Sequence, residues 1–153
     1  MTEFIVGIEA SGLATWVRES PSIWAYATIL TLHSIGLGIV VGVSVIVDLR
    51  LLGRARALEA VDLSRLFPVI WCAFAVNALT GVLLFAADAT RKSTQPIFLV
   101  KLACIGLALG VTLRTRSLLA LAAPGATSQK AWAVASLVLW FGAIAAGRLM
   151  AYL

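Results

Sequence analysis

The chain contains a single histidine, and its other ionisable side chains are sparse. His33 lies inside a long apolar run, and Lys101 and Arg148 lie inside two further apolar runs. A neutral imidazole can ligate iron or copper, whereas lysine and arginine bind carboxylates and other anions. Ionisable residues in such segments usually face a partner or an enclosed cavity, so these three residues are the first candidates for a functional site.

The composition indicates where such a site would lie. Of the 153 residues, 61% are hydrophobic and 12% are charged, and the mean hydropathy is +1.02. Soluble domains average roughly 45–50% apolar and about 25% charged residues. The composition therefore excludes an ordinary soluble enzyme, a secreted disulfide scaffold and a disordered tail, and it predicts a protein embedded in a lipid bilayer.

Four segments approach or reach the length of about 20 apolar residues that a membrane-spanning helix needs. They run approximately over residues 23–47, 67–87, 97–113 and 132–153. Residues 3–17 alternate polar and apolar positions in a pattern typical of a short amphipathic helix. The sequence therefore predicts an all-α integral membrane protein: one domain over residues 1–153, with a four-transmembrane-helix bundle and an N-terminal amphipathic helix.

The basic residues predict the orientation. The net charge is +5, but the lysines and arginines are spread through loops instead of forming the stripe that a nucleic acid would need. The first and third connections are the most basic; they hold Arg50, Arg54, Arg56, Arg65, Arg114, Arg116 and Lys130. Positive loops stay in the cytoplasm, so we expect both termini to face the periplasm from a bacterial inner membrane.

This orientation places polar residues of all four spans in the outer half of the bundle. Lys101 and Arg148 each lie about five residues from the outer boundary, or roughly 8 Å deep at the helical rise. His33 and Asn77 each lie about eleven residues from it, or roughly 16 Å deep. A deep histidine with shallower cations fits the long axis of a haem, whose two carboxylates extend away from the iron.

The sequence thus favours a b-type haem protein for electron transfer or for sensing a small ligand. His33 would ligate the iron, while Lys101 and Arg148 would bind the propionates. Gly36 would admit the ring, Trp140 would pack against it, and Asn77 would add a polar group at the depth of His33. One histidine per chain means that the iron is five-coordinate, uses another ligand or is shared between subunits. No second acid or base lies deep beside His33, so the sequence assigns no catalytic residue and leaves open whether the protein is an enzyme.

Two other hypotheses remain open from the sequence. In the first, the buried polar groups pair with one another, and the protein is a cofactor-free accessory subunit of a larger membrane complex. In the second, His33 and Cys104 bind copper. In each case Gly38 and Gly42 form a G-x-x-x-G pattern, which favours close helix contact and therefore a homo-oligomer or a membrane complex.

The first span also carries a resemblance. The run from Tyr26 to Gly53, with L-H-x-x-G near its start and D-L-R-L-L-G at its end, resembles an uncharacterised family of small four-span bacterial membrane proteins. The likeness continues through LTGVLLFAADA, PIFLVKLACIGLALG and AAGRLMAY. It implies the four-span fold but no activity. Members often have a proline and an acidic residue where this chain has Ala27 and Leu30.

A more distant likeness involves His33 together with F-x-x-K-L at Phe98 to Leu102. This combination is similar to the copper-resistance membrane proteins and to the haem-binding protoporphyrinogen oxidase of bacteria. The likeness implies a haem or copper ligand.

Overall fold

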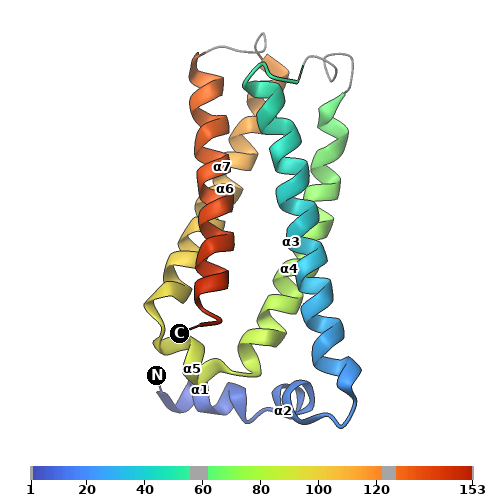
Figure 1. Cartoon of the computed structure of the whole chain (residues 1–153), viewed down its shortest axis with the longest axis vertical. Coiled ribbons are helices and arrows are strands. Elements are labelled where there is room, and N and C mark those ends of the chain that lie inside the picture. The colour runs from blue at the N-terminus through green and yellow to red at the C-terminus, as the bar shows by residue number, and fades with distance from the viewer. Residues whose placement is uncertain (1, 56–61, 122–126, 153) are drawn as a thin grey trace.

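Four long helices stand side by side in the computed structural model, which describes residues 2–55, 62–121 and 127–152 (Figure 1). They are α3 (Ile23–Leu51), α4 (Phe67–Ala86), α6 (Pro96–Leu121) and α7 (Thr127–Leu149). All four are long and apolar enough to cross a membrane. The predicted all-α four-helix bundle is therefore confirmed.

The helix ends differ from the expected ones at several points. α3 continues past residue 47 to Leu51, and α6 continues past residue 113 to Leu121. Nothing in the sequence breaks α6 before Pro124, and the long side chains of Arg114 and Arg116 can reach water from its last turns. α7 begins at Thr127, earlier than expected, and ends at Leu149.

The N-terminal segment is two helices instead of the one expected over residues 3–17. α1 (Thr2–Glu9) and α2 (Gly12–Glu19) are separated by a turn, after which the Ser11 side chain accepts a hydrogen bond from the Ala14 amide and caps α2. A further short helix, α5 (Ala89–Thr94), joins α4 to α6. α1 packs against α5, and α2 packs against α3 and α4, so these short helices cover the end of the bundle where both termini lie (Figure 1).

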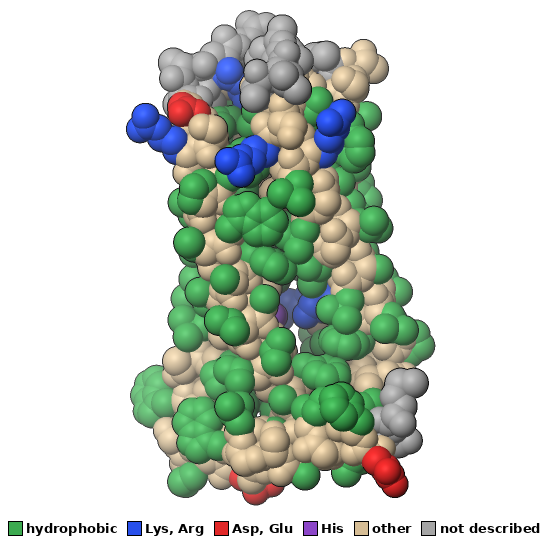
Figure 2. Space-filling model, turned by 180° about the vertical axis from the view of Figure 1, so that it is seen from behind, with side chains coloured by type: hydrophobic (Ala, Val, Ile, Leu, Met, Phe, Trp, Pro, Cys, Tyr) green, Lys and Arg blue, Asp and Glu red, His purple; other side chains and the backbone are tan. Residues whose placement is uncertain are grey.

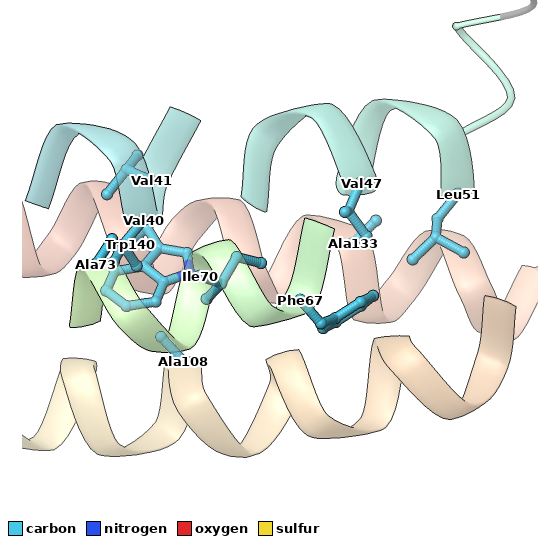
Figure 3. Close-up of a cluster of buried hydrophobic side chains, with 10 residues drawn as sticks. All are labelled: Val40, Val41, Val47, Leu51, Phe67, Ile70, Ala73, Ala108, Ala133 and Trp140. Carbon is cyan, nitrogen blue, oxygen red and sulfur yellow. The ribbon is translucent and has the colours of Figure 1, made fainter. Parts of the chain in front are cut away.

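Packing is closest within two helical hairpins, α3 with α4 and α6 with α7, and α3 joins the hairpins by packing against α7. Trp140 is buried at the centre of this junction beside Val40 and Ala73, with Ala108 on the facing helix (Figure 3). Small residues at the contacts allow membrane helices to approach closely. The 3-10 turn η2 (Leu63–Leu66) precedes α4 and is capped by Asp62.

The outer surface of the long helices is largely apolar, as expected of a surface that faces lipid (Figure 2). Basic side chains gather near the end opposite the termini (Figure 2). The described residues that place them there are Arg50, Arg54, Arg65, Arg114, Arg116 and Lys130. Arg56, from the same predicted group, lies outside the described residues. The multi-pass membrane character follows from the four spans.

Candidate functional site

A cleft of about 620 Å³ opens near the termini, between the two helical hairpins. Its lining includes the following residues of α3, α4 and α6: Tyr26, Leu30, His33, Gly81, Leu84, Phe85, Phe98 and Lys101. The space-filling view shows basic and histidine side chains inside a hollow on this part of the surface (Figure 2). The predicted convergence of polar groups from separate helices on one cavity is thus present for His33 and Lys101.

The His33 imidazole is held from one side by α4. Its Nδ1 atom lies 2.9 Å from the backbone oxygen of Asn77 and 3.2 Å from Oγ1 of Thr80. A carbonyl oxygen accepts hydrogen bonds only, so this geometry assigns the proton to Nδ1. Nε2 is therefore the basic nitrogen, and it has the lone pair that a metal ligand needs.

The Asn77 side chain fixes the same contact from the other direction. Its Nδ2 donates a hydrogen bond of 2.7 Å to the backbone oxygen of His33. Two hydrogen bonds thus join the same two residues across the α3–α4 interface. Asn77 is buried and positions the histidine; it does not line the cleft.

Gly36 brings α3 and α4 together one turn from His33. A Cβ atom at this position would lie 3.0 Å from the backbone oxygen of Ala73 and 3.1 Å from Cβ of Asn77. The space that we expected to admit a flat ring is therefore occupied by α4. The glycine instead allows the close approach that lets Asn77 reach His33.

Gly81 supports the imidazole directly. A Cβ atom on Gly81 would lie 3.1 Å from Cε1 of His33, so only a glycine gives the ring its full space. The sequence pattern places Gly81 on the same helical face as Asn77 and Thr80, but it does not show that a ring from another helix would lie against it.

Two lysines make the cleft basic. Lys101 is partly buried, and its Nζ atom would lie 3.5 Å from a Cβ atom on Gly147 of α7. Lys92, in α5, donates a hydrogen bond from Nζ to the backbone oxygen of Leu84. Burial lowers the pKa of Lys92, and this effect is opposed by the nearby carboxylate of Asp88. Cationic and apolar groups thus share one cavity.

Two other predicted residues lie away from the cleft. Arg148 is exposed, while its neighbour Gly147 lines the cleft. Trp140 is 2% exposed and belongs to the core, where its Nε1 atom has no hydrogen-bond partner among the described residues. The structure thus brings Lys101 to the cleft with His33, but it does not bring Arg148 or Trp140 there.

An aromatic pair, Phe85 and Phe98, lines the cleft instead. Their rings are stacked with centroids 5.1 Å apart and an interplanar angle of 11°. Phe98 precedes Lys101 by three residues, so helical periodicity places it on the face of the lysine. No sequence pattern indicates that Phe85 of α4 would stack on Phe98 of α6.

The short N-terminal helices contribute the mouth of the cleft through Glu9 and Arg18. The Glu9 carboxylate accepts a 2.9 Å hydrogen bond from the Thr90 amide and lies 3.4 Å from the Arg18 guanidinium. Hydrogen bonding from Thr90 lowers the pKa of Glu9, and the charge of Arg18 lowers it further. These contacts tie α1, α2 and α5 together beside the opening.

This arrangement has the chemistry of a ligand-binding cavity with one basic nitrogen. It combines an oriented imidazole, stacked aromatic rings and two amines, which together suit a molecule with a flat apolar body and anionic groups. Within the described residues, no three His, Cys, Asp or Glu side chains come together as a metal-binding group. Comparisons with family models, curated proteins and solved structures find no significant match to this chain.

Proposed function

We propose that this protein binds haem b in the membrane, with His33 as the axial ligand, for electron transfer or for sensing a small ligand. The observation that carries the proposal is the hydrogen bonding of His33. Nδ1 is fixed by the Asn77 carbonyl, and Nε2 belongs to a side chain that lines a basic cleft. Histidine ligands of metals commonly have this arrangement, with the second ring nitrogen donating to a carbonyl or carboxylate.

The rest of the cleft fits the group. Phe85, Phe98 and Leu84 offer apolar surface to a porphyrin, and Lys92 and Lys101 offer ammonium groups to its propionates. When bound, haem supplies reversible one-electron transfer and a site for a small ligand at the iron. The chain would orient the imidazole, exclude water with the aromatic pair and neutralise the carboxylates with the two lysines.

The test is the absorption spectrum of the purified full-length protein, expressed with adequate haem. We expect a Soret band in the wild type and its loss in His33→Ala. Ser34→Ala is the matched control, because Ser34 is the exposed neighbour whose hydroxyl bonds only its own helix, at Leu30. Gel filtration of each variant confirms that the bundle is intact.

Lys101→Met tests the anion-binding role separately. Hydrogen bonds to charged groups contribute about 1.5–3 kcal/mol, so haem affinity should fall about tenfold or more while the band remains. A colourless wild type, or a spectrum unchanged in His33→Ala, would contradict the proposal. Colourless protein that co-purifies with a larger complex would instead support a cofactor-free accessory subunit.

Copper has less support than haem in the described structure. The partner suggested for His33 was Cys104, whose Sγ atom would lie 3.4 Å from a Cβ atom on Gly142 of α7. The cysteine is not among the residues that line the cleft. Metal analysis of the same preparation distinguishes iron from copper.

The location that accompanies this function is the bacterial inner membrane, with both termini in the periplasm. Its support is the basic end opposite the termini, which the positive-inside rule assigns to the cytoplasm. Self-association is supported by Gly38 and Gly42. Both are exposed on α3, and a Cβ atom on either would meet nothing within 4 Å.

A further inference from the structure

A second polar cluster lies inside the bundle, toward the end opposite the termini. Its centre is Asp48 of α3, which is 1% exposed. Four hydroxyl side chains from α3, α6 and α7 line the same small space: Ser44, Thr112, Thr115 and Ser136, each 3% exposed or less. Val47 of α3 and Phe67 and Ile70 of α4 also line it. None of these residues lines the cleft that contains His33 and Lys101.

Two oxygen atoms in this cluster lack partners. Neither Oδ2 of Asp48 nor Oγ of Ser44 forms a hydrogen bond in the described structure, so the two do not bond each other. Of the described residues, Ser136 is the side chain whose hydroxyl reaches the Asp48 carboxyl group. The space between the lining residues is too narrow for a water molecule. Buried polar atoms of this kind require an explanation.

A negative charge on Asp48 would be uncompensated by the described side chains. None of the ion pairs among them involves Asp48, and every side chain lining the space around it is neutral. The charged groups of the adjoining helices at this end are Arg50 of α3, Arg114 and Arg116 of α6 and Lys130 of α7. None of them lines the space around Asp48, and the Arg116 guanidinium lies 5.8 Å from the ring centroid of Phe67. A bare carboxylate inside a membrane bundle is costly. One positive charge at the site would remove that cost.

The two threonines of the cluster have hydroxyl oxygens that can accept. Thr112 donates its hydroxyl proton to the Ala108 carbonyl at 2.9 Å, and Thr115 donates to the Thr112 carbonyl at 2.9 Å. Each hydroxyl proton is thus used within α6, and the lone pairs of each oxygen are left to accept. The cluster therefore has one carboxylate and several neutral, hard oxygen atoms.

We propose that Asp48 and its surrounding hydroxyls bind one dehydrated sodium ion. Hard cations prefer oxygen ligands, and a single positive charge balances the single carboxylate. A divalent ion would leave an excess buried charge, and a hydrated ion would not fit a space that excludes water. A proton on Asp48 would neutralise the carboxylate but leave the Ser44 oxygen without a partner. This inference stands independently of haem binding.

Thermal unfolding of the full-length protein in detergent tests the site. NaCl is replaced stepwise by choline chloride at constant ionic strength and pH. At a sodium concentration about 100-fold above the dissociation constant, the Tm of the wild type should rise by about 5–10 °C relative to choline. Asp48→Asn should lose this response and should be more stable than the wild type in choline, because the buried charge is gone.

Two variants and one binding measurement complete the test. Ser44→Ala should weaken the sodium response, whereas Asp62→Asn should keep it, because Asp62 is an exposed carboxylate near the same end of the bundle. Equilibrium dialysis with radioactive sodium should find about one ion per wild-type chain, and this result does not depend on any variant folding. Equal Tm values in sodium and choline, a full response in Asp48→Asn, or no bound sodium would overturn the proposal. Stability that follows pH but not sodium would assign a proton to Asp48 and would also overturn it.

Discussion

Gly36→Ala tests whether the α3–α4 contact positions His33. The new Cβ atom would lie 3.0 Å from the Ala73 oxygen and 3.1 Å from Cβ of Asn77, and neither atom is the end of a flexible side chain. The helices must therefore separate by a few tenths of an ångström. Overpacking of this kind costs about 1–3 kcal/mol, whereas alanine is favoured over glycine in a helix by about 1 kcal/mol.

Gly110→Ala provides the matched control, because a Cβ atom at Gly110 of α6 meets nothing within 4 Å. Both variants gain the same helix propensity, so the difference between them isolates the clash. We expect Gly36→Ala to be less stable than Gly110→Ala by about 1–3 kcal/mol in denaturing-detergent titrations followed by circular dichroism. Equal stability of the two variants would refute the close approach and with it the account of how Asn77 reaches His33.

Three further predictions concern the same regions. Gly81→Ala places a Cβ atom 3.1 Å from Cε1 of His33, so haem affinity should fall about tenfold in a hemin titration; an unchanged affinity would argue against the imidazole position. The hydrogen bond from Thr90 lowers the pKa of the Glu9 carboxylate below its ordinary 4.5. The stabilisation from this hydrogen bond is therefore fully present above pH 4.5 and is lost as the pH falls through the lower pKa of Glu9 in the folded state. Tryptophan fluorescence should report this acid transition in the wild type and not in Glu9→Gln; an identical transition in both would exclude Glu9 as its cause. Gly42→Leu should reduce self-association in analytical ultracentrifugation without unfolding the chain, because no atom lies within 4 Å of its Cβ position, and unchanged association would place the interface elsewhere.

The four spans could be predicted from sequence because hydrophobic length is a strong constraint in membranes. The helix ends were harder to predict. Arg114 and Arg116 suggested a loop, yet they lie within α6, because long basic side chains can reach water from a helix. The break between α1 and α2 depends on one serine cap and has no strong apolar signal.

The sequence predicted how deep in the membrane the site residues lie, but it predicted only for some of them that their side chains face the cleft. Helical rise correctly brought His33 and Lys101 to one cleft. Trp140 and Arg148 were expected there too, but they lie in the core and on the surface respectively. A helix that is apolar around its circumference gives little indication of which face meets which neighbour. Asp48 was missed for a related reason: at the end of an apolar run it resembles a boundary residue, and only tertiary packing shows that it is buried.

The division into two hairpins has a consequence for how the protein is made. α3 and α4 emerge from the ribosome before α6 and α7, and each pair packs mainly with itself. The first hairpin can therefore enter the bilayer with the histidine already anchored, while the lysine that faces it is still being synthesised. The cleft is lined by residues of both hairpins, so it forms only when they dock. A molecule bound across the cleft would hold the two hairpins together and would bind only after the chain is fully assembled.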